Sequence, residues 1–121
     1  MPQGGIEENE APYETAIREL MEEVGTDNVK LLHQSKNWYA YDFPDDLRSI
    51  VWSGKYVGQK QMWFLFKFLG KDSEINIKTK NPEFINWKWI EFDRLPEIIV
   101  YFKKELYLNL VKEFGSIVSS I

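Results

Sequence analysis

The chain has 121 residues, no cysteine and a formal net charge of −4 at pH 7. Its length suits one domain with a real core, and the lack of cysteine excludes disulfides, thiolate catalysis and zinc–thiolate sites. The negative charge argues against a protein that coats bulk nucleic acid, and no apolar run reaches the roughly 18 residues of a membrane span. We therefore expect one soluble, cytoplasmic domain over residues 1–121.

The predicted elements begin with a loop over 1–10 and a helix over 12–24. Pro12 suits a first helical turn, because its missing N–H is not needed there, and Gly25 is typical of the residue that ends a helix. One face of the helix is apolar at helical spacing, and it consists of Ala16, Ile17, Leu20, Met21 and Val24. The acidic side chains of this helix are therefore expected to face away from the core.

Strands and a second helical region follow, and the aromatic content of 16% favours the strands. Strands are predicted over 29–35, 37–43, 56–70, a short part of 71–84, and 85–92. From Asp93 onward we predict helix, with an apolar stripe that ends at Gly115. This stripe is expected to be core and consists of Ile99, Phe102, Leu106, Leu110 and Phe114. This order predicts an α+β fold, an α/β/α sandwich and not a helical bundle.

Three glutamates crowd the polar side of the first helix. Residues three and four apart share a helix face, so Glu19 lies beside Glu22 and Glu23, and like charges at this spacing cost roughly 0.2–0.5 kcal/mol per pair. Carboxylates are preferred ligands of Mg²⁺ and Mn²⁺, so bound cations would offset that repulsion. The alternative is a solvated acidic face on which Arg18 bridges Glu14 and Glu22. Spacing alone leaves both interpretations open.

The residues around the trio resemble the Nudix box, G-x5-E-x7-R-E-U-x-E-E-x-G-U, in which U is aliphatic. Eight positions agree with this pattern: Gly4, Glu10, Arg18, Glu19, Leu20, Glu22, Glu23 and Gly25. Only Thr26 departs from it, at a position where a bulky aliphatic residue is usual, so we expect weaker packing beyond the helix.

The resemblance implies the Nudix fold, a mixed sheet between helices, and attack of water on a phosphorus of a pyrophosphate link. It also implies metal ligands in the loop and on the helix, namely Gly4 through its backbone carbonyl, Glu19, Glu22 and Glu23. One of these glutamates would position or deprotonate the attacking water, and the resemblance leaves open which one. A salt bridge between Glu10 and Arg18 would hold the loop against the helix.

Further segments resemble one branch of the family, the bacterial RNA pyrophosphohydrolases and the related dinucleoside polyphosphate hydrolases. "GQKQMWF" from residue 58 and "PEFINWKW" from residue 82 carry this resemblance. It implies Glu83 as a further catalytic and metal-binding carboxylate. The implied substrate contacts are Gln3, Tyr41, Gln59, Lys60, Phe102 and Lys103. Tyr41 and Phe102 would line the nucleotide pocket, although core packing is an equal alternative for Phe102, and Lys60 would contact phosphate.

The resemblance to this branch implies Mg²⁺-dependent removal of pyrophosphate from the 5′-triphosphate end of RNA. The alternatives are hydrolysis of dinucleoside polyphosphates such as diadenosine tetraphosphate, and an inactive nucleotide-binding remnant. The box begins at Gly4, so the strands that usually precede it are expected to be missing. We therefore expect unpaired sheet edges, and a destabilised monomer or a sheet completed by a homodimer or strand exchange. His33 is expected to be a structural or surface residue.

Overall fold

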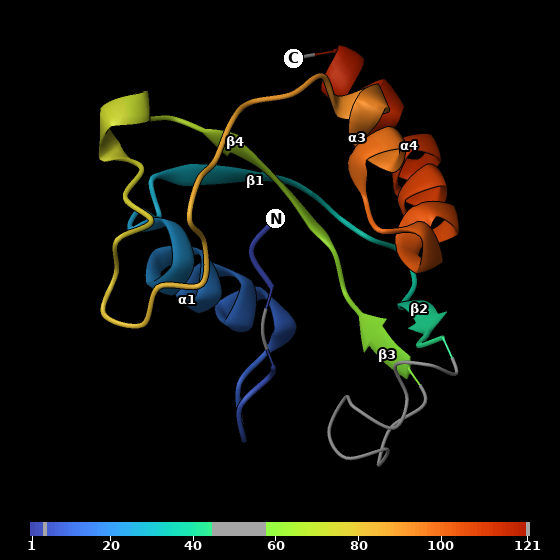
Figure 1. Cartoon of the computed structure of the whole chain (residues 1–121), viewed down its shortest axis with the longest axis horizontal. Coiled ribbons are helices and arrows are strands. Elements are labelled where there is room, and N and C mark those ends of the chain that lie inside the picture. Colours follow the sequence, from blue (N-terminus) through green and yellow to red (C-terminus); the bar gives the residue numbers. More distant parts are fainter. Residues whose placement is uncertain (4, 45–57, 121) are drawn as a thin grey trace. The chain divides into compact units, whose positions relative to one another are not determined.

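The structure is a computed structural model, and it describes residues 1–3, 5–44 and 58–120 (Figure 1). The chain divides into two compact units, which are described separately: Met1–Leu32 with Phe64–Trp89, and His33–Trp63 with Ile90–Ile121. None of the described helices combines the length and the apolar character that crossing a bilayer requires.

The first unit is built from one helix and a pair of strands. Its elements are α1 (Pro12–Val24), most of β1 (Val29–Gln34), β4 (Phe64–Phe68) and a 3₁₀ turn at Asp72–Glu74. The helix α1 has the predicted bounds, and β1 and β4 pair into a two-stranded sheet (Figure 1). Tyr13 of α1 packs its ring against Phe64 and Phe66 of β4, with centroid distances of 6.0 and 6.3 Å. These aromatic contacts fix the helix on the sheet.

The second unit joins a strand pair to a helical region. Its elements are β2 (Tyr39–Asp42), β3 (Gly58–Gln61), 3₁₀ turns at Phe92–Arg94 and Tyr101–Lys103, α3 (Leu95–Ile98) and α4 (Lys104–Ser119). The strands β2 and β3 are antiparallel, and α3 lies beside α4 (Figure 1). The core gathers on the buried side chains Tyr41, Phe43, Leu106, Tyr107, Leu110 and Phe114. Three of these six belong to the apolar stripe predicted from the sequence.

Glu113 of α4 ties three segments of the second unit together. Its carboxylate accepts hydrogen bonds from the Tyr39 hydroxyl at 2.7 Å and the Lys36 backbone N–H at 3.1 Å, and it lies 2.8 Å from Nε2 of His33. Burial acts to raise the pKa of Glu113, but these hydrogen bonds outweigh it and lower the pKa. The His33 ring also meets Phe114 edge-on, at 5.3 Å. His33 therefore has the structural role expected of it.

The long strand predicted over 56–70 is wrong as one element, because it is divided into β3 and β4. Between the two strands, Ser35 satisfies both backbone hydrogen-bonding groups of Trp63. The backbone N–H of Ser35 donates to the Trp63 carbonyl at 2.7 Å, and the Ser35 hydroxyl accepts the Trp63 N–H at 3.0 Å. A side chain thus replaces the ladder at this point. The interruption lets one continuous stretch pair first with β2 and then with β1.

Neither the strand predicted over 85–92 nor the short strand predicted within 71–84 is formed. Residues 71–84 contain only the 3₁₀ turn at Asp72–Glu74. Alternation predicts a strand only where a neighbouring strand completes the ladder, and none pairs with these stretches among the described residues. Trp89 instead stacks on Phe68 at 6.0 Å, meets Trp87 edge-on and donates its indole N–H to Asp72 at 2.9 Å. Aromatic packing holds this segment in place of backbone pairing.

The helix predicted from Asp93 onward is interrupted, and the apolar stripe predicted to end at Gly115 continues beyond it. Ile99 and Val100, both β-branched, have extended backbones between α3 and α4. Gly115 lies inside α4, which runs on to Ser119. The half-buried side chains of Ile117 and Val118 continue the apolar stripe, so packing carries the helix past the glycine.

Gly25 ends α1 as predicted, for two independent reasons. Its φ of 75° is left-handed, and its N–H donates to the Met21 carbonyl at 3.1 Å. A Cβ at this position would lie 2.8 Å from the carbonyl oxygen of Asn76. Both the conformation and the close approach therefore require glycine.

Replacing Gly25 by alanine is expected to lower the free energy of unfolding by about 1–2 kcal/mol, the cost of a side chain in the left-handed conformation. Gly115 is the matched control, because it is helical and a Cβ there meets nothing within 4 Å. Gly115→Ala is expected to raise the same free energy by roughly 0.5–1 kcal/mol. Urea unfolding of the three chains measures both effects, and a loss of the same size at both positions would contradict this assignment.

Candidate active site

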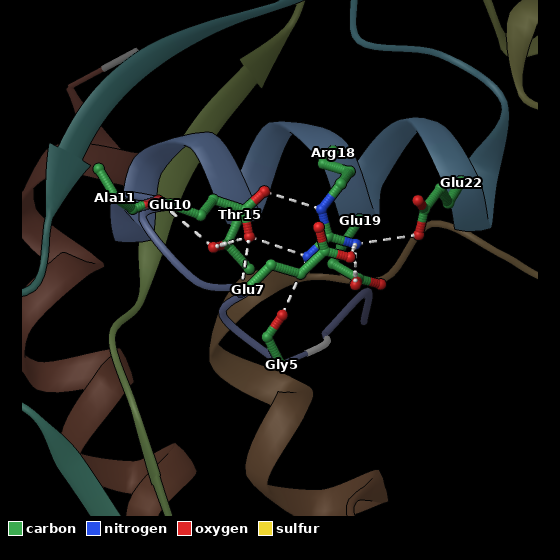
Figure 2. Close-up of polar contacts among 8 residues, drawn as sticks. All are labelled: Gly5, Glu7, Glu10, Ala11, Thr15, Arg18, Glu19 and Glu22. Atoms are coloured by element: carbon green, nitrogen blue, oxygen red, sulfur yellow. Dashed lines mark hydrogen bonds and ion pairs between the residues drawn. The ribbon is translucent and has the colours of Figure 1, made fainter.

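Arg18 of α1 anchors the loop that precedes the helix (Figure 2). Its Nε and Nη2 lie 2.8 and 3.0 Å from the two carboxylate oxygens of Glu10, and Nη2 also donates to the carbonyl of Gly5 at 2.9 Å. This two-pronged contact matches the planar guanidinium fork. The salt bridge implied by the resemblance is therefore present in the structure.

Glu10 is further held by two residues that the sequence did not single out. The buried Thr15 hydroxyl donates to Oε1 of Glu10 at 2.6 Å, and the backbone N–H of Glu7 donates to the same oxygen at 3.0 Å. Hydrogen bonding to Arg18, followed by these two contacts, lowers the pKa of Glu10 to about 2. A buried threonine on a polar helix face is the only signal that could have pointed to this contact.

Glu19 and Glu22 turn toward Arg18 (Figure 2). Nη1 of Arg18 lies 2.7 Å from Oε1 of Glu19 and 3.2 Å from Oε2 of Glu22. Part of the alternative interpretation is thus realised, since Arg18 and Glu22 form an ion pair at i, i+4. Within the described part of the chain, no three acidic or histidine side chains are gathered closely enough to hold a metal ion. The expectation that the three glutamates share one small volume is not met here.

Glu23 lies apart from that ion pair and is buried, with 3% of its surface exposed. The carboxyl of Glu83 and the backbone of Gln3 lie close enough to influence its pKa, and its Oε2 is buried without a hydrogen-bond partner among the described residues. Burial, then the hydrogen bond and charge of Glu83 and the charge of Glu19, raise the pKa of Glu23 to about 8. The structure therefore brings Glu83 to the helix, as the resemblance implied.

A divalent cation fits this donor set. A buried carboxylate oxygen without a donor costs free energy, and a second carboxylate beside it adds repulsion that a cation would remove. Hard carboxylate oxygens are the ligands that Mg²⁺ and Mn²⁺ prefer. Glu23 and Glu83 would be donors to such a cation, whereas Glu19 and Glu22 contact Arg18 in the structure, so the predicted ligand set stays a prediction. Gly4, the predicted carbonyl ligand, lies outside the described residues.

Three of the predicted substrate contacts form one cluster in the second unit. Tyr41 is buried, and its ring lies 6.0 Å from that of Phe102 and 5.7 Å from that of Phe43. The Lys103 ammonium lies 5.0 Å from the centre of the Tyr41 ring, within cation–π range. Burial lowers the pKa of Lys103 and raises that of Tyr41. Phe102 therefore packs against the buried aromatic side chains, and its role in a nucleotide pocket stays a prediction.

The predicted phosphate contact, Lys60, is not brought into that cluster. Lys60 pairs with Ala40 in the antiparallel register, while Tyr41 pairs with Gln59. Because side chains alternate between the two faces of a strand, Lys60 and Tyr41 fall on opposite faces of the strand pair. Lys60 is exposed, and the side chain of Gln59 lies outside the described part of the structure.

The NUDIX domain family matches residues 1–110 of the chain. The chain belongs to the Nudix family. It is 49% identical over 119 residues to a protein named RNA pyrophosphohydrolase from Wolbachia pipientis subsp. Culex pipiens, covering 98% of this chain and 74% of that protein. It is 48% identical over 118 residues to proteins of the same name from Rickettsia rickettsii (strain Sheila Smith) and Rickettsia canadensis (strain McKiel), covering 98% of this chain and 73% of each.

Membership of the Nudix family confirms the resemblance and the α+β fold class predicted from the sequence. Nudix hydrolases use divalent metal ions, in agreement with the coarse prediction of a divalent cation. Thr26, the one position that departs from the Nudix box, is buried and accepts the Asn28 backbone N–H at 3.2 Å. Its hydroxyl therefore supplies a local turn contact where the family usually packs an aliphatic side chain.

Proposed function

We propose that this chain is an RNA pyrophosphohydrolase, which removes pyrophosphate from the 5′-triphosphate end of RNA. The observation that carries the proposal is its identity of 48–49%, over nearly its whole length, to proteins of that name. The chemistry of the site supports it, because the described part of the Nudix box retains Glu19, Glu22 and Glu23 and adds Glu83 from a distant loop. Glu23 is buried, and its Oε2 has no hydrogen-bond partner among the described residues, a cost that a bound cation would offset.

In the proposed reaction, Glu19, Glu22, Glu23 and Glu83 would hold Mg²⁺ or Mn²⁺. When bound, the cation supplies charge neutralisation at phosphate oxygens and a lowered pKa for attached water. Tyr41 and Phe102 in the second unit offer aromatic rings on which a base can stack. Lys103, kept close to an aromatic ring and partly buried, would contact phosphate or ribose oxygens with its ammonium group.

The experiment that tests this proposal compares two substrates. We expect the 121-residue chain with Mg²⁺ to release pyrophosphate from 5′-triphosphorylated RNA, and to act more slowly on diadenosine tetraphosphate. Chromatography of the products from parallel reactions measures both rates. Faster turnover of diadenosine tetraphosphate would favour the alternative dinucleoside polyphosphate hydrolase, and binding of both without turnover would favour the nucleotide-binding remnant.

Self-association is a further part of the proposal. The first unit exposes large apolar side chains at Leu69, Ile85 and Trp89, and its described sheet has only two strands. Unpaired edges and exposed apolar surface favour a second copy as the partner. Sedimentation of the purified chain would reveal such a homodimer as a concentration-dependent increase in mass.

A further inference from the structure

Glu113 of α4 is an acidic side chain that lies mostly out of solvent, with 16% of its side chain exposed. Its carboxylate accepts the Tyr39 hydroxyl at 2.7 Å and the Lys36 backbone N–H at 3.1 Å. Burial, followed by the hydrogen bond to Glu113, raises the pKa of Tyr39 to about 12, so the hydroxyl keeps its proton at neutral pH and remains the donor. The start of β2 and the segment before it are therefore tied to α4 through one carboxylate.

A second contact ties the same strand to the turn that precedes α4. Tyr39 and Tyr41 are two positions apart in β2, so their side chains lie on the same face of the strand. Tyr41 is buried, with its ring 6.0 Å from that of Phe102 and 5.0 Å from the Lys103 ammonium. Eleven residues separate Phe102 from Glu113, which corresponds to about 15 Å along a helix. Two contacts this far apart set the direction of β2 against the helix.

We propose that Glu113 is a positioning residue for nucleotide binding: through Tyr39 it holds β2 so that the Tyr41 ring lies against Phe102 and Lys103. The inference rests on the proposed function, in which these side chains contact the nucleotide end of the RNA. Strand β2 has four residues and pairs only with β3 among the described strands. A strand pair of this size needs packing against a helix to hold its place, and Glu113 supplies the polar part of that packing.

Two variants weaken this anchor without changing a proposed binding residue. Tyr39→Phe keeps the ring and removes the hydroxyl, and Glu113→Gln removes the charge and keeps the shape. Glu105→Gln is the matched control, because Glu105 is an exposed glutamate of the same helix. Proton NMR of the intact chain reports on the Lys103 ε-methylene, which is bonded to the ammonium group beside the Tyr41 ring. We expect its upfield ring-current shift in the wild-type and control chains, and a shift toward the value of a free lysine in both variants.

Steady-state kinetics on 5′-triphosphorylated RNA provide the second measurement. We expect KM to rise about three- to tenfold in Tyr39→Phe and Glu113→Gln, the size of one lost hydrogen bond. The value of kcat should stay within about twofold of wild type, because the anchor acts on nucleotide binding and not on the reacting phosphorus. A purely structural role of Glu113 would reduce the fraction of folded chain, which lowers the apparent kcat and leaves KM unchanged.

The outcomes separate this inference from the proposed function. Unchanged Lys103 protons in both folded variants would overturn the inference, and so would an unchanged KM. If the wild-type chain binds 5′-triphosphorylated RNA but does not hydrolyse it, the proposed function fails, and the dissociation constant from fluorescence anisotropy takes the place of KM. Binding that is then about three- to tenfold weaker in both variants supports the role of Glu113, and equal binding overturns it. A wild-type chain that does not bind this RNA would overturn both.

Discussion

Replacing Glu22 by glutamine is expected to slow hydrolysis of 5′-triphosphorylated RNA by about 10²- to 10⁴-fold, the range that corresponds to several kcal/mol of metal-dependent stabilisation. The substitution removes one negative charge from the proposed metal site and keeps the shape of the side chain. It should not unfold the protein. The side chain is 57% exposed, and its ion pair with Arg18 is of the surface type, which contributes at most about 1 kcal/mol.

The matched control for this experiment is Glu14→Gln, the same chemical change on the same helix. Glu14 is exposed in the first turn of α1 and occupies an unspecified position of the Nudix box, between Glu10 and Arg18. We expect this variant to keep the wild-type rate, and circular dichroism should show that both variants remain helical. A Glu22→Gln chain that retains a rate within a few-fold of the control would rule out Glu22 as a metal ligand.

The sequence predicted those parts of the fold that depend on contacts between residues close together in the chain. The helix over Pro12–Val24 has its predicted bounds, because a proline at the start, a glycine at the end and one apolar face all indicate the same element. The salt bridge between Glu10 and Arg18 was implied by the resemblance to the Nudix box, and it is present in the structure. These features are encoded within about two dozen residues, where the sequence determines geometry directly.

Contacts between distant residues could not be predicted in this way. Ser35 interrupts the long strand by bonding Trp63, and Glu113 joins His33 across 80 positions. Neither residue differs in type or spacing from an ordinary surface residue. The segment 85–92 shows the same limit of sequence-based prediction. Its apolar and polar residues alternate as in a strand, but a strand forms only where a partner elsewhere in the chain pairs with it.

For the candidate site, the sequence likewise predicted which residues are involved but not how their side chains are arranged. Spacing placed Glu19, Glu22 and Glu23 on one helix face, and the described structure then divides them between Arg18 and Glu83. Periodicity places side chains on a face of the helix but does not show which of them pair with Arg18.

Glu23 is expected to destabilise the metal-free chain and to stabilise the metal-bound one. Its pKa is raised from an ordinary value of 4.5 to about 8 in the folded chain. Between these values the folded state holds a proton that the unfolded state has released, so the free energy of unfolding falls as pH rises through this range. Without metal, the midpoint of thermal unfolding should therefore be several degrees lower at pH 8 than at pH 5.5.

Glu23→Gln should remove this part of the pH dependence, because a neutral amide has no proton to lose. At pH 8 the variant should be more stable than the wild-type chain without metal. The order should reverse when Mg²⁺ is added, since only the wild-type carboxylate gains from the cation, and turnover of the variant should fall with it. Glu14→Gln serves again as the control and should keep the wild-type slope. Calorimetric unfolding at the two pH values, with Mg²⁺ or with a chelator, measures all four cases. A wild-type chain that becomes more stable toward pH 8 without metal would show that the buried carboxyl of Glu23 does not lower the stability of the chain.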